Sequence, residues 1–346
     1  MLTVFCEDHR LHFGPSEMFR GKVEPWFEKP SRADMVLNRV MSENLGDIVA
    51  PHDFGLDVIH KVHDEAYVSF IREAWGRWVA AGRSGYIFPS TFPTHKMSRQ
   101  GPISDAIVGQ MGYYSFDNEA PISEGTWKAV YGSAQVALTA QDHIRQGARA
   151  AFGLCRPPGH HAGTNFMGGY CYLNNAALAA QAFLEQGAKR VAILDVDYHH
   201  GNGTQDIFYQ RKDVLFASIH ATPQAEYPYF VGHKDERGES DGEGFNFNYP
   251  LELGIAWQEW SAALEDACKK ISAYAPDAIL ISLGVDTFEG DPISQFKLRS
   301  TDFIRMGERI ADLGLPTLFI MEGGYAVSDI GVNAVNVLLG FEGRSC

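Results

Sequence analysis

The sequence of 346 residues is poor in cysteine and has none of the usual cysteine motifs. Its five cysteines are an odd number, stand far apart and include no Cys-x-x-Cys pair, so neither a disulfide framework nor a thiolate zinc site is indicated. The pattern is typical of a reducing compartment. The five residues are Cys6, Cys155, Cys171, Cys268 and Cys346.

Long apolar runs are also missing. The N-terminal stretch MLTVFCEDHRLHF reaches charged residues after a few positions and lacks the apolar centre of a signal peptide. No other run approaches the length of a membrane-spanning helix. We therefore expect a cytoplasmic protein that has no membrane partner.

The sequence has no long basic run, and the 43 Asp and Glu residues outnumber the 29 Lys and Arg residues, for a formal net charge of −14. Nucleic acid is therefore not expected as a partner. A negative field favours a cationic ligand. Ordinary solubility gives the same balance, so the charge permits a cationic ligand without requiring one.

What the sequence does contain is an alternation of strand and helix patterns. Short apolar runs alternate with amphipathic stretches, which predicts a mainly parallel sheet with helices on both faces. We interpret residues 1–346 as a single-domain, three-layer α/β fold. The expected strands are 2–5, 150–154, 191–194, 214–219, 278–283 and 317–321, and the expected helices are 31–41, 59–79, 126–144, 175–184, 257–274, 303–313 and 330–339.

The first half also contains a long segment without clear periodicity. Residues 86–121 hold four prolines, several glycines and serines, and clustered aromatics. Such a loop is typical of a lid, a binding element or an assembly surface. His63, in the helical pattern before it, is expected to be structural or at the surface rather than a ligand.

The stretch VAILDVDYHHGNG at 191–203 gathers reactive side chains. Its apolar start predicts a buried strand ending near Asp195, and residues two apart on an extended chain project to the same side. Asp197 and His199 can therefore reach one point, as a metal ion requires. Taken alone, they are equally typical of a polar turn.

The other strands favour the metal site, because ligands bind at the carboxyl ends of open parallel sheets. Five expected strands in the second half are each followed by polar side chains. Asp197, His199 and Asp286 would supply one nitrogen and two carboxylates and leave a tetrahedral position open, a pattern typical of catalytic zinc.

Three more residues are suited to acid–base and oxyanion chemistry. His160 and His161 lie in CRPPGHHAG, where two prolines and a glycine fix the turn, so both imidazoles can face the same rim. Tyr325 lies in MEGGYA, where two glycines would let its phenol approach a developing oxyanion. Without the other parts, Tyr325 would be interpreted as a core tyrosine behind a glycine turn.

Five motifs together resemble the zinc-dependent, histone deacetylase-like branch of the arginase/deacetylase fold. They are RPPGHHAG, GGYCYLNNAA, LDVDYHHGNGTQDIFY, LGVDTFEGDP and MEGGY. The stretches FCEDHRLHF, GYYSFDNEAPISEGTW and DPISQFKL are similar to the bacterial acetylpolyamine amidohydrolases in particular. The resemblance covers nearly the whole chain and keeps the motifs in order.

The resemblance implies a hydrolase of linear amide C–N bonds with one catalytic zinc ion. The implied zinc ligands are Asp197, His199 and Asp286, and the implied catalytic residues are His160, His161 as the more favoured general base, and Tyr325 as the group that polarises the carbonyl. Asp195 is implied to orient His160 and, with Ser218, to hold a structural potassium ion. The implied tunnel residues are Tyr170 and Tyr227 in the wall and Gly169 at the floor.

In the implied reaction, His161 takes a proton from the attacking water and a protonated histidine releases the amine. Asn202 stands where histone deacetylases often have an aspartate beside the second histidine. A neutral partner should leave His161 with a lower pKa than His160, because the expected partner of His160 is the anionic Asp195.

The resemblance also implies a small cationic acetylated amine as the substrate. Glu17 and Glu119 match acidic positions near the polyamine site, although each alone is also typical of a solvated surface acid. Val108 stands where the polyamine enzymes carry another acid, which favours acetylputrescine and acetylcadaverine over long polyamines. Residues 86–121 resemble the insertion with which those enzymes dimerise, so a homodimer is expected.

Three rival functions fit parts of the pattern. A broader deacylase would act on acetyl-lysine peptides or small amides. An arginase-like ureohydrolase would need two manganese ions and more bridging carboxylates, and it would have no use for Tyr325. A metal-dependent ligand sensor would not require every catalytic position to be filled, as it is here.

Overall fold

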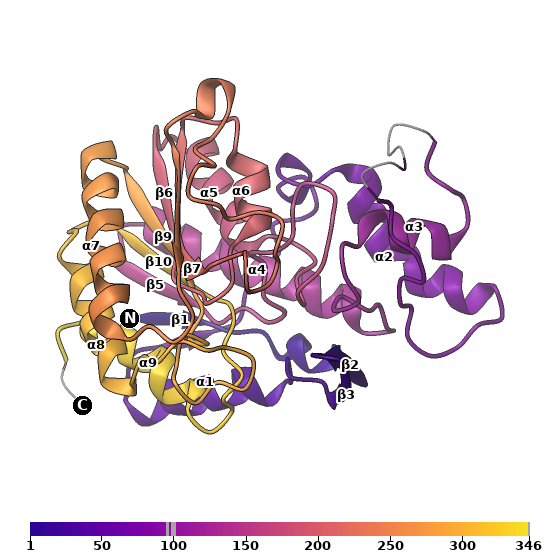
Figure 1. The fold of residues 1–346 in the computed structure, drawn as a ribbon, viewed down its shortest axis with the longest axis horizontal. Coiled ribbons are helices and arrows are strands. Elements are labelled where there is room, and N and C mark those ends of the chain that lie inside the picture. The colour runs from indigo at the N-terminus through magenta and orange to yellow at the C-terminus, as the bar shows by residue number, and fades with distance from the viewer. Residues whose placement is uncertain (95–96, 98–101, 345–346) are drawn as a thin grey trace.

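A parallel sheet of eight strands forms the centre of the computed structural model, which describes residues 1–94, 97 and 102–344 (Figure 1). The strand order is β4-β1-β5-β10-β9-β6-β7-β8, and each neighbouring pair is parallel. The carboxyl ends of all these strands therefore lie along one edge. The strands are β1 (Leu2–Val4), β4 (Ile48–Val49), β5 (Ala150–Gly153), β6 (Val191–Asp195), β7 (Val214–Ala221), β8 (Asn246–Leu251), β9 (Ala278–Leu283) and β10 (Thr317–Met321).

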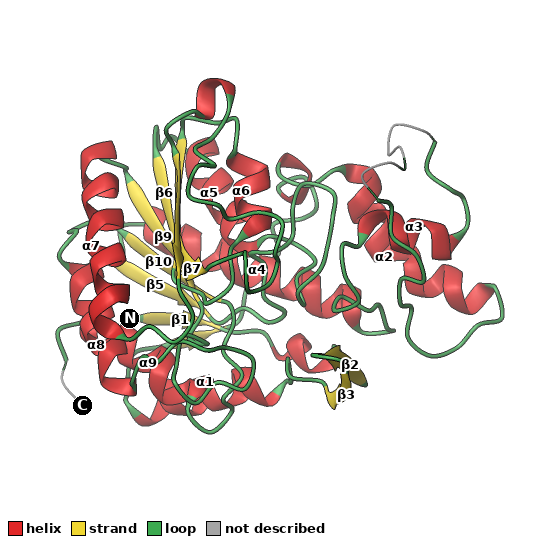
Figure 2. Ribbon diagram, in the orientation of Figure 1, coloured by secondary structure: helices red, strands yellow, loops and turns green. Residues whose placement is uncertain are grey.

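Helices cover both faces of the sheet (Figure 2). The helices α4 (Thr126–Arg145) and α5 (Asn175–Glu185) pack on one face, with α2 (Glu65–Ala80) and α3 (Ile107–Tyr114) extending the same core. On the other face lie α1 (Ser31–Ser42), α7 (Trp257–Tyr274), α8 (Ser300–Ala311) and α9 (Ile330–Phe341). The short helix α6 (Asn202–Phe208) follows the β6 loop.

The two cores explain why the central strands are continuously apolar. Ile193 packs in the core that includes α4 and α5, whereas its neighbour Leu194 packs in the core on the opposite face. Because both faces of a parallel sheet are buried, successive residues must all be apolar. The expected three-layer, mainly parallel α/β fold is confirmed, and strands 278–283 and 317–321 and helix 257–274 have the predicted bounds.

The prediction of a single helix at 59–79 was wrong. A short 3-10 helix, Ile59–Lys61, precedes α2, and the chain leaves helical geometry between them. The backbone N–H of Asp64 donates to Thr164 O at 3.0 Å instead of to the preceding helical turn. The His63 side chain bonds the same part of the chain: Nδ1 lies 2.9 Å from Gly163 O, and Nε2 accepts from Asn174 N at 2.9 Å. His63 is therefore buried and structural, one of the two alternatives expected for it.

The segment 86–121 was expected to be irregular, but it contains α3. Ile107, Met111 and Tyr114 are buried at helical spacing against α2. The weak amphipathic pattern was hidden by glycines at 109 and 112. Residues 95, 96 and 98–101 of this segment lie outside the described residues.

Four strands were not expected. The edge strand β8 has buried asparagines, Asn246 and Asn248, where an alternating pattern would have apolar residues, and Pro250 is tolerated only because the strand is at an edge. Strand β4 has two residues. The hairpin formed by β2 (Ser16–Phe19) and β3 (Lys22–Pro25) stands apart from the main sheet.

Two expectations from the composition, about cysteines and about membrane spans, can be compared with the structure for the described residues. Cys6, Cys155, Cys171 and Cys268 are free thiols, and Cys346 lies outside the described residues. Within the described ranges, no helix combines the length and the apolar character needed to cross a membrane.

Candidate active site

Asp197, His199 and Asp286 converge at the carboxyl edge of the sheet. Asp197 and His199 follow β6, and Asp286 follows the adjacent strand β9. One ligand atom from each lies within 4.8 Å of the others. His199 Nδ1 is 3.1 Å from Asp286 Oδ2 and 3.4 Å from Asp197 Oδ1, so the imidazole nitrogen and both carboxylates face one point.

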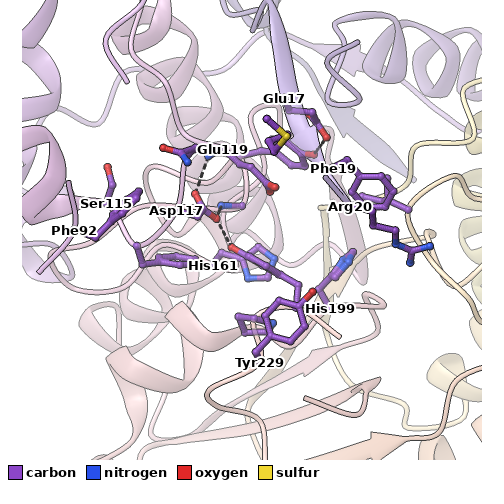
Figure 3. A pocket seen from close by; sticks show the side chains of 18 of the residues that line it. Glu17, Phe19, Arg20, Phe92, Ser115, Asp117, Glu119, His161, His199 and Tyr229 are labelled. Atoms are coloured by element: carbon purple, nitrogen blue, oxygen red, sulfur yellow. Dashed lines mark hydrogen bonds between the residues drawn. The ribbon is translucent and has the colours of Figure 1, made fainter. Parts of the chain in front are cut away.

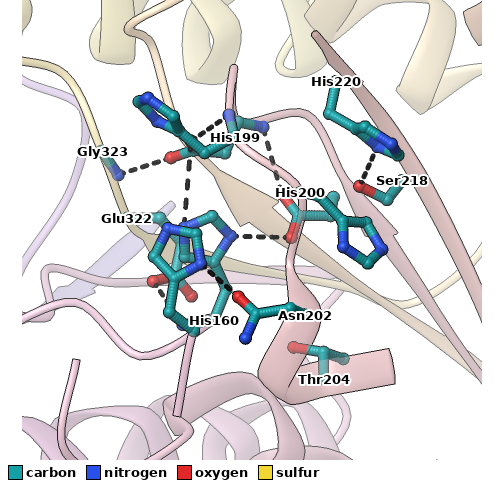
Figure 4. A network of polar contacts seen from close by, with 12 residues as sticks. His160, His199, His200, Asn202, Thr204, Ser218, His220, Glu322 and Gly323 are labelled. Carbon is teal, nitrogen blue, oxygen red and sulfur yellow. Dashed lines mark hydrogen bonds and ion pairs between the residues drawn. The ribbon is translucent and has the colours of Figure 1, made fainter. Parts of the chain in front are cut away.

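Backbone donors hold the two carboxylates in place. Gly323 N donates to Asp197 Oδ2 at 2.8 Å (Figure 4). Tyr198 N donates to Asp286 Oδ1 at 2.9 Å. A side chain on Gly323 would collide with Asp197 and Asp286, so this position requires glycine. The loop after β10 therefore approaches the two carboxylates so closely that only glycine fits at position 323.

The charges of this cluster fit a divalent metal ion. Asp197 and Asp286 are fully buried, and their ion-pair partners among the described residues are histidines, with no Lys or Arg. Two buried carboxylates without a Lys or Arg partner are costly, and a divalent cation would neutralise them. One imidazole and two carboxylates are suitable ligands for zinc and leave a position open.

The tandem histidines have different partners, as expected from the sequence. His160 Nδ1 lies 2.9 Å from Asp195 Oδ2, and His161 Nδ1 lies 2.7 Å from Asn202 Oδ1. Burial lowers the pKa of His160, but Asp197 and Asp195 outweigh it and raise that pKa to about 10. Burial and the neighbouring charge of His160, whose ring centroid is 3.9 Å away, hold the pKa of His161 well below its usual range.

His161 has a neutral partner in Asn202, so Asn202→Asp is expected to move the acid limb of the kcat/KM–pH profile upward. An anion beside Nδ1 favours imidazolium and should raise the pKa of His161 by about 1 unit or more. A base must be deprotonated to act, so activity would be lost at a higher pH than in the wild type. The measurement is the pH profile of both proteins; superimposable acid limbs would contradict the assignment of His161 as the base.

Tyr325 is held in place by one contact to its backbone and one to its ring. Its backbone N–H donates to Asp291 Oδ2 at 2.6 Å, and the guanidinium of Arg32 lies 4.7 Å from its ring centroid. Arg32 also donates to the carbonyl oxygens of Gly324 at 2.5 Å and Glu322 at 2.6 Å. Burial raises the pKa of Tyr325 well above its usual range, and Arg32 offsets only part of this, so the phenol keeps its proton.

A cavity of about 1080 Å³ leads to His161, His199 and Tyr325 (Figure 3). Tyr170 and Tyr227 form part of its wall, as expected, and Gly169 lies between them and His161. Gly169 has a φ of +51°, and a side chain there would collide with the imidazole of His161 and the Tyr227 hydroxyl. The narrow base of the cavity therefore requires this glycine.

Residues 26–340 match the histone deacetylase domain. The chain belongs to the histone deacetylase family. It is 68% identical over 345 residues to acetylpolyamine amidohydrolase 1 of Pseudomonas aeruginosa, with 100% of both chains covered. It is 50% identical to the acetylpolyamine amidohydrolase of Mycoplana ramosa, over 99% of this chain and 100% of that one. The crystal structure of acetylpolyamine aminohydrolase from Burkholderia pseudomallei superimposes with a TM-score of 0.93 at 39% identity and covers 100% of both chains.

The expected resemblance to acetylpolyamine amidohydrolases is thereby confirmed. As a member of the histone deacetylase family, this protein is a hydrolase of amide bonds. This activity excludes two of the rival functions considered above, an arginase-like ureohydrolase and a metal-dependent ligand sensor. Among the described residues, the second cluster with metal-ligand spacing is His160, Cys171 and Glu322, which lacks the bridging carboxylates of a two-manganese site.

The cavity of this histone deacetylase family member is lined by four acids, Glu17, Asp117, Glu119 and Glu226, of which Glu17 and Glu119 were expected. Glu17 is buried: its Oε1 accepts from the Tyr170 hydroxyl at 2.8 Å, and its Oε2 accepts from Phe27 N at 3.2 Å. It is therefore not a solvated surface acid, and burial raises its pKa to about 7. Glu119 lines the same cavity and is partly buried, and burial raises its pKa well above the usual range.

Asp117, like Glu226, was missed from the sequence. Its Oδ2 accepts from Gly169 N at 2.8 Å and from the Tyr227 hydroxyl at 2.6 Å, so it joins the floor of the cavity to the wall. Asp117 lies in a bend of the chain, where its Oδ1 accepts from Glu119 N at 2.8 Å, so no strand or helix periodicity marks it in the sequence. Arg32, Asp291 and Arg20 were also missed, because nothing local relates them to the site.

Asp195 and Ser218 are aligned across β6 and β7 in this fold. Asp195 is already bonded twice, through Oδ2 to His160 and through Oδ1 to the backbone N–H of Asp197. The Ser218 hydroxyl lies 2.8 Å from His220 Nδ1. The potassium site at Asp195 and Ser218 stays a prediction.

Proposed function

We propose that this protein hydrolyses the acetamide bond of N-acetylated polyamines and short diamines, such as acetylputrescine and acetylcadaverine, with a zinc ion held by Asp197, His199 and Asp286. The observation that carries the proposal is a cavity that contains Glu17, Asp117 and Glu119 and opens onto His161, His199 and Tyr325. An acetyl group would enter at the base, and the ammonium group would pair with the acids. The names of the relatives reported above support the same substrate class.

When bound, zinc would polarise the amide carbonyl and make the attacking water more acidic. The other steps belong to side chains. Tyr325 donates its phenol hydrogen to the carbonyl oxygen as negative charge develops there. Neutral His161 accepts the proton of the attacking water, while His160 stays cationic beside Asp195. Protonated His161 then donates to the departing amine nitrogen, which leaves as a neutral amine.

The rival within the same family is a broader deacylase that accepts acetyl-lysine peptides. A panel of acetylputrescine, acetylcadaverine, the uncharged analogue N-pentylacetamide and an acetyl-lysine peptide separates the two. We expect kcat/KM for acetylcadaverine to exceed that for the analogue and for the peptide by about 10-fold or more, the factor given by about 1.4 kcal/mol of ionic interaction. Equal or faster hydrolysis of the peptide would establish the broader deacylase instead.

The Glu17→Gln variant tests whether the acids cause this preference. Glutamine keeps the shape and one acceptor for Tyr170, so KM for acetylcadaverine should rise by about 10-fold while kcat/KM for N-pentylacetamide stays constant. Because the pKa of Glu17 is about 7, the wild-type KM should fall as the pH rises through 7 and the carboxylate becomes anionic. The variant should lose that pH dependence; its retention would show that another group binds the ammonium.

We also propose that the protein is a homodimer that covers the rim of the cavity. Several apolar side chains project from this rim, and Phe230 is 87% exposed. Clustered exposed apolar residues are typical of an interface. Sedimentation velocity should give a species of twice 38.3 kDa, and a monomer at micromolar concentration would contradict this proposal. The cytoplasmic location stays a prediction.

A further inference from the structure

One cationic side chain lines a cavity that is otherwise acidic. Apart from the two active-site histidines, Arg20 is the only basic residue among the described residues that line the cavity, and the acids are Glu17, Asp117, Glu119 and Glu226. An arginine opposes the binding of a cation. Its presence in a cavity proposed to bind ammonium groups therefore needs a physical explanation.

Arg20 is fixed at the tip of the β2–β3 hairpin. Arg20 and Gly21 form the two-residue turn, with φ values of +48° and +78°, as in the hairpin turns that match strand twist. The guanidinium lies 4.9 Å from the ring centroid of Phe19, and its Nη2 is 3.8 Å from Glu226 Oε2. Glu226 is buried and also accepts from the Tyr198 hydroxyl at 3.0 Å, so the partner of Arg20 is itself held in place.

Glu17 and Asp117 lie deeper in the cavity than Arg20. Glu17 and Asp117 bond directly to Tyr170 and Tyr227, in the wall next to the catalytic residues. Arg20 is 56% exposed and therefore lies towards solvent, and Figure 3 shows it on the His199 side of the cavity, with Asp117 on the other side of His161. An extended substrate would place its first amine near these acids. The part of the substrate beyond that amine would lie near Arg20.

We propose that Arg20 determines substrate specificity by charge: it disfavours acetylated amines that carry a second cationic centre beyond the first ammonium group. The inference rests on the proposed function and narrows its substrate class to acetylated amines with one positive charge. The physical cause is like-charge repulsion at a fixed guanidinium, which raises the free energy of one substrate relative to another. The same charge would favour a substrate with a carboxylate at that position.

The test compares two matched pairs of substrates. Acetylputrescine and the acetylspermidine that is acetylated on its aminobutyl end have the same spacing from amide to first cationic nitrogen, and the second has one more charge. Acetylcadaverine and free Nε-acetyl-lysine differ only by the carboxylate. Arg20→Gln removes the charge, Arg20→Lys keeps it, and Lys22→Gln is the control, because Lys22 is exposed on the same hairpin and does not line the cavity.

In Arg20→Gln, we expect the ratio of kcat/KM for acetylputrescine to that for acetylspermidine to fall by about threefold to fivefold, the range for a charge pair with solvent access. The ratio for acetyl-lysine to acetylcadaverine should fall as well, which a merely structural effect would not produce. Both changes should shrink in high salt. Arg20→Lys and Lys22→Gln should keep the wild-type ratios.

Equal changes for both members of each pair would overturn the charge-selection proposal while leaving the proposed function intact, provided that the wild type hydrolyses acetylputrescine. If the wild type hydrolyses none of the four amides, the proposed function fails and this inference fails with it. A fall in the acetylspermidine ratio in Lys22→Gln as large as in Arg20→Gln would assign the effect to net charge and would also overturn the role of Arg20.

Discussion

Asp286→Asn is expected to abolish metal binding and to lower kcat/KM by about 10³-fold or more, the effect of losing several kcal/mol of metal-derived transition-state stabilisation. Asparagine keeps the shape of the side chain but removes one of two carboxylates that face His199 Nδ1. A site with one anionic ligand fewer no longer neutralises a divalent cation. Metal content per chain should fall from about one to nearly zero.

Thermal unfolding gives a readout that does not depend on activity. A metal ion that binds only the folded state stabilises it, so a chelator should lower the Tm of the wild type. The same chelator should leave the Tm of Asp286→Asn unchanged, because there is no bound ion to remove. Asp266→Asn is a matched control, since Asp266 accepts an exposed hydrogen bond from Tyr249, outside the site. A chelator effect of equal size in Asp286→Asn and the wild type would refute the proposed metal site.

Tyr325→Phe is expected to lower kcat by about 10²- to 10³-fold, the range for loss of one oxyanion donor. The phenol bonds the carbonyl oxygen most strongly when negative charge develops, so KM should change little. Phenylalanine keeps the ring that packs against Arg32 and Tyr170, so the fold and the metal content should be preserved.

The control for Tyr325→Phe is Tyr274→Phe. Tyr274, at the end of α7 and away from the cavity, donates its hydroxyl hydrogen to the carbonyl of Lys212, so this variant should keep wild-type kcat. Steady-state kinetics with acetylcadaverine measures both. If Tyr325→Phe retained more than about a tenth of wild-type kcat, another donor would have to stabilise the oxyanion.

Arg32 has a central position in the site that the sequence did not indicate. It reaches from α1 to the backbone of Glu322 and Gly324 and to the ring of Tyr325, across nearly the whole length of the chain. Its charge is paired with Glu28 at 2.8 Å in a buried contact. The first helix of the protein therefore positions a residue that follows its last strand.

The sequence predicted some elements better than others for a physical reason. Strands β9 and β10 are buried on both faces, so they appear as uninterrupted apolar runs, and α7 has one regular apolar stripe against the sheet. Strand β8 is an edge strand with buried asparagines, and α3 packs against α2 rather than the sheet. Neither segment has the regular apolar periodicity from which a strand or a helix can be predicted.

The sequence by itself predicted that Asp197, His199, Asp286 and the histidine pair lie at the carboxyl edge of the sheet. Asp197 and His199 are two residues apart after one buried strand, and Asp286 follows another, so local periodicity and the shared carboxyl edge were sufficient for that prediction. That the two strands are neighbours was decided by the fold. Only the tertiary structure decided which acids line the cavity, that Asp117 joins its floor to its wall, and that Arg20 faces it. Those side chains come from a hairpin and loops whose placement depends on contacts between residues far apart in the chain, and such contacts leave no periodic trace in any one segment.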